Sequence, residues 1–362
     1  MSRRLQVEDA PAPGDIPVDP LAWLGSLGGA VAWRVPGRDR SRVRVVTTLL
    51  HGNEPSGFLA MQEWLRGAPA PAVDVVLVIA NVEAAGLHPA FTHRMVPGRP
   101  DLNRCFLGPF EGVEGELARA ILELVEDLRP EALVDLHNNT GHNPVYGVGV
   151  EPTREVLSLC SIFGQRFIWS QLSLGALLEA VSVCPALTIE VGKSGEESAN
   201  EAALEGLTRF ADATRLFHSK GCEADQEDET DETEEDAIGD PGSVRVLRMP
   251  MRAMLEPGRR LVMGTLPHAD ADLTMPDDLD RHNFEVVEPG HRIGWIRGEG
   301  CPLRLIDEDG RDRADEYFER RGDELVAHRA FTPIMITVDA EIAAADCLFY
   351  IVSAVENGFS GA

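Results

Sequence analysis

The chain has 362 residues, of which 44% are hydrophobic and 26% charged, so it is long enough to form two domains with buried cores. Its 33 basic and 60 acidic residues give a net charge of −27. This excess of acid argues against a nucleic-acid partner, because phosphate binding needs clustered Lys and Arg, and against docking on an anionic membrane surface.

The first half of the chain alternates between strand-like and helix-like segments. Residues 1–40 are rich in Pro and Gly and are expected to form an N-terminal extension with one short helix at 19–26. The apolar run at 43–50 predicts a buried strand that ends at a His-Gly-Asn turn, and Pro55 follows at the expected start of a helix. Further strands are expected at 73–80, 132–137 and 185–192, and further helices at 115–128 and 197–218. This alternation predicts an α/β catalytic domain over residues 41–219 with a largely parallel sheet.

The second half differs in composition. Residues 223–240 contain 11 acidic residues and no basic residue, which predicts a disordered linker over 220–242. Beyond it, short apolar runs are separated by Gly, Pro and Asp. This pattern predicts a smaller, β-rich C-terminal domain over 243–362.

The sequence shows no sign of export or membrane insertion. The N-terminus lacks the apolar stretch of a secretory signal, and no apolar run reaches the roughly 20 residues of a spanning helix. The six cysteines are scattered and form no CxxC pair, as in proteins whose thiols stay reduced. We therefore expect a cytoplasmic protein without a membrane partner.

Candidate metal ligands lie at the polar ends of two predicted strands. His51 and Glu54 are three residues apart at a turn from strand to helix, and His137 ends the strand 132–137. Imidazole and carboxylate are usual ligands of a catalytic zinc, which keeps one position open. Taken singly, HxxE also fits a helix-capping Glu beside a surface His, and His137 fits an ordinary buried histidine. Asp135 points to the same side of its strand as His137 and is a candidate to orient that ring, or simply a hydrogen-bond partner at a loop end.

Two further features suggest chemistry. Glu190 lies inside an apolar strand, where a carboxylate is costly unless it is paired or functional. Burial would raise its pKa toward a value that suits proton transfer. The segment 101–106 (DLNRCF), with Arg94 seven residues upstream, combines Arg and Asn, which suit a carboxylate or a polarised carbonyl. Alone, that segment is also consistent with a turn carrying a solvated arginine.

Five motifs in order give a specific resemblance. HGNE (51–54), NVEA (81–84), DLNRCF (101–106), DLHNNTG (135–141) and IEVGKS (189–194) resemble the succinylglutamate desuccinylase/aspartoacylase family, which belongs to the zinc-carboxypeptidase clan. The resemblance covers about 42–220 and weakens in the C-terminal part. It implies a zinc-carboxypeptidase-like α/β fold: a mixed, largely parallel sheet flanked by helices, with a smaller C-terminal β-rich domain.

The resemblance also implies functions for individual residues. His51, Glu54 and His137 match the zinc ligands of the family, which implies one Zn²⁺ per chain. Glu190 matches its catalytic glutamate. The residues that we place at the substrate are Asn103, Arg104 and Asn138.

Other positions match the family less closely. Arg94 resembles the arginine that polarises the scissile carbonyl, but its distance to DLNR is two residues longer than usual, so Arg99 is a competitor. Tyr317, within DEYFE (315–319), resembles a tyrosine that contacts substrate in aspartoacylases. The family arginine ten residues before the catalytic glutamate is replaced here by Ala180, next to Glu179, so one anion clamp is missing.

The resemblance predicts a zinc-dependent hydrolase that cleaves the amide bond of a small N-acyl amino acid into a carboxylic acid and a free amino acid. The missing arginine leaves open a zinc carboxypeptidase or a peptidoglycan-type amidase that acts on peptides. A third alternative is a non-catalytic metal- or partner-binding protein, although the presence of Glu190 argues against it. The sequence leaves open whether the chain forms a homo-oligomer.

Overall fold

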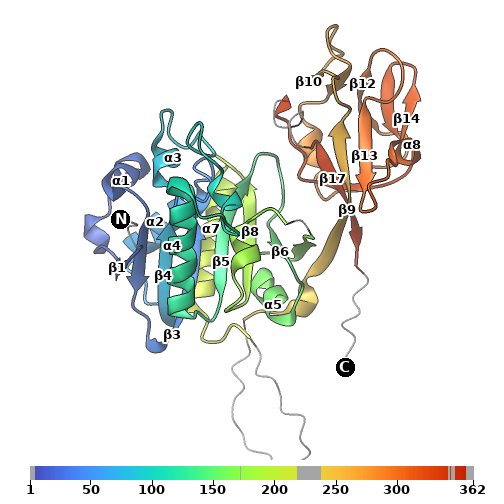
Figure 1. Ribbon diagram of the computed structural model, residues 1–362. Helices are drawn as coiled ribbons and strands as arrows, with labels where there is room; N and C mark the ends of the chain where they lie inside the picture. Colours follow the sequence, from blue (N-terminus) through green and yellow to red (C-terminus); the bar gives the residue numbers. More distant parts are fainter. Residues whose placement is uncertain (1–4, 172, 218–237, 341–342, 344–346, 356–362) are drawn as a thin grey trace, which may run out of the picture.

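The computed structural model describes residues 5–171, 173–217, 238–340, 343 and 347–355 (Figure 1). Residues 220–237 of the expected acidic linker lie outside these ranges. The described chain forms two sheets, one of twelve and one of five strands. Among the described residues, no helix combines the length and apolar character needed to cross a bilayer.

The twelve-stranded sheet forms the frame of the molecule. Its strands follow the order β1-β2-β4-β3-β5-β8-β6-β7-β9-β17-β16, with β13 also paired to β9. The first eight in the chain are β1 (Val7–Asp9), β2 (Val31–Val35), β3 (Asp39–Thr48), β4 (Val73–Ile79), β5 (Leu133–Asn139), β6 (Tyr146–Gly149), β7 (Arg166–Trp169) and β8 (Ala186–Lys193). Strands β4, β3, β5 and β8 are parallel to one another, whereas β2 and β6 run antiparallel to their neighbours β4 and β8. The predicted mixed, largely parallel sheet is therefore confirmed.

Helices cover both faces of this sheet. They are α1 (Pro20–Leu27), α2 (Ser56–Arg66), α3 (Val82–Gly86), α4 (Gly112–Leu128), α5 (Arg154–Phe163), α6 (Leu177–Ala180) and α7 (Glu197–Asp212). Val46 and Leu136 share one core cluster with α2, α5 and α7, whereas Val45 and Leu133 pack with α4 on the other face. Adjacent valines enter opposite cores because side chains alternate along a strand. The near-continuous apolar runs of the sequence thus follow from burial on both faces.

The N-terminal residues contribute more structure than one helix. Helix α1 lies within one residue of the expected 19–26, and Asp19 caps it by accepting from the backbone N–H groups of Leu21 and Ala22. Around this helix, β1 and β2 pair in parallel and extend the sheet beyond β4. The segment therefore covers what would otherwise be the exposed edge of β4.

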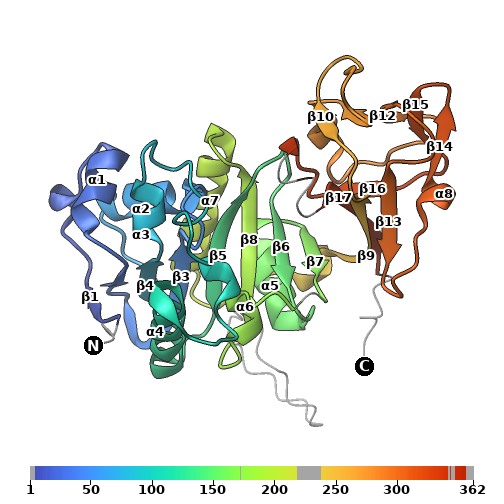
Figure 2. The same cartoon turned by 45° about the horizontal axis from the view of Figure 1, so that its top comes forward.

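The C-terminal residues form a second lobe that shares the large sheet (Figures 1 and 2). Its strands are β9 (Arg245–Leu255), β13 (Leu303–Asp307), β16 (Thr332–Ile334) and β17 (Phe349–Ala354). The start of β9 pairs in parallel with β7, and its end pairs with β13, so one continuous strand joins the two lobes. The five-stranded sheet completes the lobe in the order β10 (Leu261–Met263), β11 (Leu273–Met275), β12 (Arg292–Ile296), β15 (Glu324–Ala327) and β14 (Phe318–Arg321), next to α8 (Ala314–Tyr317). The predicted smaller β-rich part is confirmed.

Candidate active site

The turn after β3 places His51 and Glu54 at the carboxyl end of the sheet. Leu49 adopts a positive φ of 55° as the chain leaves the strand, and the turn ends at α2. Gly52 is required by close packing, because a Cβ there would lie 2.4 Å from the backbone nitrogen of Ala85. His51 and Glu54 are buried, with 4% and 7% of their surfaces exposed. The turn therefore holds two polar side chains in a fixed position inside the protein.

His137 reaches the same place from β5. Because β3 and β5 are parallel neighbours, their carboxyl ends meet at one edge of the sheet. Oε1 of Glu54 lies 2.8 Å from His51 Nδ1, and Oε2 lies 2.7 Å from His137 Nδ1. The three predicted ligands offer atoms that all lie within 4.8 Å of one another, so they could hold one metal ion.

Two aspartates orient the histidine rings from behind. Asp135 Oδ2 lies 2.6 Å from His137 Nε2, and Asp101 Oδ1 lies 3.1 Å from His51 Nε2. These contacts direct Nδ1 of each ring toward Glu54, as carboxylates do in metal sites. Burial opposes charge on His137, but Asp135 and Glu54 outweigh it and raise the pKa of that histidine well above its usual value. The surrounding carboxylates thus create a place that favours positive charge.

Glu190 faces this group from β8. In the sheet it pairs with His137, and Asn139 Nδ2 donates to its Oε2 at 2.9 Å. Tyr146 in turn donates its hydroxyl to Asn139 Oδ1 at 2.9 Å. Burial is the main cause that raises the pKa of Glu190 to about 7; Glu54 adds to the rise, and the nearby histidines and Arg94 oppose it. A carboxyl group with this pKa can both accept and return a proton near neutrality.

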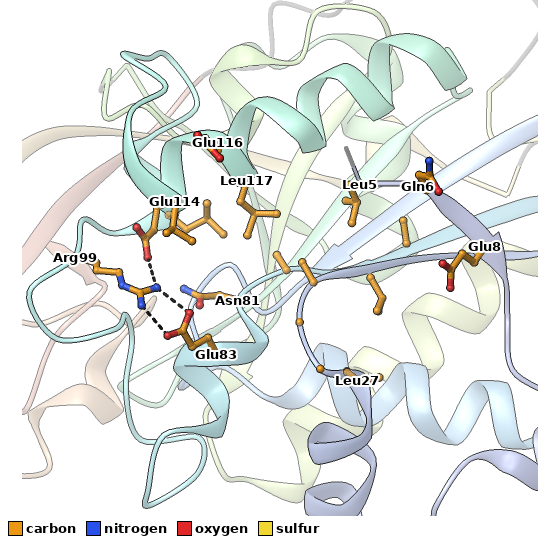
Figure 3. A pocket seen from close by; sticks show the side chains of 18 residues that line it. Leu5, Gln6, Glu8, Leu27, Asn81, Glu83, Arg99, Glu114, Glu116 and Leu117 are labelled. Atoms are coloured by element: carbon orange, nitrogen blue, oxygen red, sulfur yellow. Dashed lines mark hydrogen bonds and ion pairs between the residues drawn. The ribbon is translucent and has the colours of Figure 1, made fainter. Parts of the chain in front are cut away.

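The structure separates the two candidate arginines. Arg94 lines the same pocket; its Nε donates to Asp101 at 2.9 Å, and its Nη1 lies 3.5 Å from Glu54. Arg99 lies instead in a separate cavity, where it pairs with Glu83 at 2.7 Å and with Glu114 at 3.3 Å (Figure 3). The geometry therefore favours Arg94 as the arginine near the reacting groups.

The segment with Asn103 and Arg104 forms a single 3-10 turn beside the pocket. Asn103 is buried, and its Oδ1 accepts from the backbone N–H of Leu177, which fixes the start of α6. Arg104 is exposed in the pocket, and its Nη1 donates to the carbonyl of Asn103 at 2.8 Å. Both predicted residues therefore line the pocket, but Arg104 is the one that presents a charged group to it.

Asn138 lines the pocket, but its side chain makes hydrogen bonds to other residues of the protein. Its Nδ2 donates to Ser56 and to the carbonyl of Gly192, and its Oδ1 accepts from the backbone of Ser56. Its backbone N–H donates to Glu54 Oε2 at 3.2 Å, which helps to hold the candidate metal ligand. Side chains alternate along β5, so Asn139 rather than Asn138 shares the face of His137. This alternation is the sequence signal that could have identified Asn139, which is not among the site residues predicted from the sequence.

Tyr317 does not line this pocket. Its ring packs 6.2 Å from that of Phe331, and the guanidinium of Arg329 lies 4.9 Å above it. The tyrosine of the C-terminal lobe that does line the pocket is Tyr350, from β17. No local motif marks Tyr350, because its place depends on how β17 pairs with β9.

The pocket itself has a volume of about 450 Å³, which suits a small molecule. Its polar side is formed by the residues described above. The remaining lining residues are mostly apolar, and they come from the loop before α6, from α6 and from the C-terminal lobe. Both lobes thus contribute to one site.

A mixed α/β sheet that gathers histidines, carboxylates and an arginine around one pocket at its carboxyl edge is suited to acid–base chemistry on a small molecule. Residues 44–213 match the model of the succinylglutamate desuccinylase/aspartoacylase catalytic domain. The matched segment is a domain of this type, and it spans 170 of the 362 residues. No curated protein sequence matches the chain.

Solved structures share the fold across both lobes. A succinylglutamate desuccinylase/aspartoacylase from Rhodobacter sphaeroides is 15% identical, with 91% of this chain and 89% of that chain covered and a TM-score of 0.58. A succinylglutamate desuccinylase from Silicibacter sp. TM1040 is 15% identical, with 90% and 88% covered and a TM-score of 0.55. The product-bound ectoine utilization protein EutE (DoeB) from Ruegeria pomeroyi is 17% identical, with 89% and 88% covered and a TM-score of 0.53.

Proposed function

We propose that this protein is a zinc-dependent hydrolase that cleaves the amide bond of a small N-acyl amino acid into a carboxylic acid and a free amino acid. The observation that carries the proposal is the place of Glu190. Its carboxyl group, with a pKa of about 7, shares one pocket with the donor set of His51, Glu54 and His137. The match of residues 44–213 to the succinylglutamate desuccinylase/aspartoacylase catalytic domain supports the class of reaction.

The donor set fits zinc. Two imidazole nitrogens and one carboxylate converge, and the far nitrogens of both rings face aspartates. One Zn²⁺ per chain would be held by His51, Glu54 and His137. When bound, zinc supplies Lewis-acid chemistry that polarises a carbonyl and makes water easier to deprotonate.

The chain's own residues supply the remaining steps. Glu190 takes a proton from the attacking water and delivers it to the leaving nitrogen, which a pKa near 7 allows in both directions. Arg94 stabilises the negative charge that develops on the carbonyl oxygen, a contribution of about 3–4 kcal/mol for one such donor. Arg104 holds the carboxylate of the substrate through charge-assisted hydrogen bonds. Water adds across the amide bond, so one acid and one amine leave the site.

The test combines metal analysis with a hydrolysis screen. The full-length protein is expected to bind one zinc and to hydrolyse members of a panel of N-succinyl, N-acetyl and N-formyl amino acids. The variant Glu190→Gln is expected to lose about 10²–10⁴-fold in kcat and to keep its zinc. If the protein cleaved peptides at their C-terminal end and hydrolysed none of the N-acyl amino acids, the deacylase proposal would be overturned in favour of a carboxypeptidase or peptidoglycan-type amidase. Unchanged turnover in Glu190→Gln would overturn the mechanism.

We also propose that the protein works in the cytoplasm. Cys105, Cys160, Cys184 and Cys301 form no disulfide, which suits a compartment that keeps thiols reduced. Localisation by fractionation with an antibody to the native chain tests this, and recovery in an extracytoplasmic fraction would contradict it.

A further inference from the structure

The polar side of the pocket offers one guanidinium that is not paired with an acid. Among the described lining residues, Arg94 and Arg104 are the two that carry a Lys or Arg side chain. Arg94 pairs with Asp101 and lies close to Glu54. Arg104 makes no ion pair with any described residue, and its Nη1 donates to the backbone carbonyl of Asn103. The pocket therefore has one cation suited to a carboxylate of the substrate.

A second part of the pocket lining is mostly apolar, although Ser170, Thr188 and Thr337 also line the pocket. We call this part the apolar wall, and it consists of Leu174, Leu178, Met249, Met335, Ile336 and Tyr350. Glu179 also lines the pocket, and its carboxylate accepts hydrogen bonds from the backbone N–H groups of Leu174 and Gly175. Glu179 thus fixes the loop before α6, and no cation lies among the described residues of this wall.

We propose that the preferred substrate carries a single carboxylate, bound at Arg104, and an uncharged apolar group that packs against the apolar wall. The inference rests on the proposed function and names its substrate class. A second carboxylate placed against the apolar wall would lose water without gaining a cationic partner, which is costly. An apolar group in the same place gains from the area that it removes from water.

The apolar group is either the side chain of the amino acid or the acyl chain, since both have the same chemistry. The panel therefore has two apolar arms, N-acetyl-L-leucine and N-hexanoylglycine, and one dicarboxylic arm, N-acetyl-L-aspartate and N-succinyl-L-glutamate. Each is assayed with the zinc-loaded full-length protein. At least one apolar arm is expected to exceed the dicarboxylic arm in kcat/KM by about 100-fold, and the better apolar arm identifies which group meets the wall.

A new cation in the apolar wall tests the reason for this preference. Leu174 is 44% exposed, so Leu174→Arg is expected to fold and to shift the ratio of dicarboxylic to apolar kcat/KM by at least about tenfold toward the dicarboxylic arm. The matched control is Leu266→Arg, at a residue that is 74% exposed and does not line the pocket, and its ratio should stay that of the parent.

The outcomes separate this inference from the proposed function. Amide hydrolysis with the dicarboxylic arm preferred would overturn the inference and leave the proposed function standing. An unchanged ratio in a folded Leu174→Arg protein would overturn the inference as well. If no N-acyl amino acid were hydrolysed by the zinc-loaded protein, the proposed function would fail and the inference with it.

Discussion

Replacing Asp135 by asparagine tests how the buried ring of His137 is held. Asp135 is 1% exposed; its Oδ2 lies 2.6 Å from His137 Nε2, and its Oδ1 accepts from Thr47 Oγ1 at 2.5 Å. The asparagine keeps the shape of the side chain but removes its charge, and with it the charge-assisted bond that orients the ring. A weaker hold on the ring makes Nδ1 a poorer and less basic metal ligand.

The size of the effect follows from this contact. Changes of such an outer partner commonly lower metal affinity by about 10–100-fold, which corresponds to about 1.4–2.7 kcal/mol. The assay is the zinc dissociation constant of the full-length protein, measured by competition with a chromophoric chelator. Asp135→Asn is expected to weaken zinc binding by that factor while the protein remains folded.

A matched control separates metal binding from general stability. Asp74 is also 1% exposed and pairs with Arg34 and Arg40, but it lies near the start of β4, away from the carboxyl edge of the sheet. Asp74→Asn is expected to lower the melting temperature and to leave the zinc dissociation constant unchanged. The reasoning would be refuted if Asp135→Asn bound zinc within about threefold of the parent, or if Asp74→Asn weakened binding equally.

Three further predictions concern other parts of the structure. Asn139→Ala removes the hydrogen bond to Glu190 and is expected to lower kcat about tenfold or more with little change in KM, as steady-state kinetics would show. Arg44→Met removes a fully buried guanidinium that pairs with Glu131 at 2.9 Å, and is expected to cost about 3 kcal/mol of unfolding free energy in urea titration. Gly52→Ala places a Cβ 2.4 Å from the backbone of Ala85, and is expected to cost about 1–3 kcal/mol and to weaken zinc binding.

Each of these has its own control. A KM effect without a kcat effect in Asn139→Ala would show that this residue does not position the base. Arg42 also pairs with Glu131, but its side chain is 36% exposed. Arg42→Met should therefore lower the unfolding free energy by less than about 1 kcal/mol, and a loss equal to that of Arg44→Met would contradict the argument from burial. Gly86→Ala, where a Cβ meets nothing within 4 Å, should leave zinc affinity and stability nearly unchanged, and a loss equal to that of Gly52→Ala would refute the packing argument.

Local patterns were sufficient for much of the frame. The strands at 43–50, 73–80, 132–137 and 185–192 were predictable because strands buried on both faces need continuous apolar runs, and β3, β4, β5 and β8 match them. The short strands β6 and β7 were not predicted, because four residues carry too little pattern. Helix α7 ends at Asp212, short of the expected 218, since periodicity marks the body of a helix better than its end.

The same contrast holds for the site. The ends of β3 and β5 are local features, so the convergence of His51, Glu54 and His137 followed from parallel neighbouring strands once the sheet was assumed. The sequence did not decide between Arg94 and Arg99. Their positions depend on the path of the loop between α3 and α4 and on the ion pair that each arginine forms there.

The sequence alone determined the class of fold and the residues around the candidate metal site, since these depend on contacts close along the chain or between neighbouring strands. Only the tertiary structure decided which tyrosine reaches the pocket and which residues form the apolar wall of the pocket. Tyr350 and Met335 lie about 200 residues after His137, and they reach the pocket because β9 carries the large sheet into the C-terminal lobe, where β17 pairs with it. Contacts at such separations are set by the packing of whole elements, which no local pattern records.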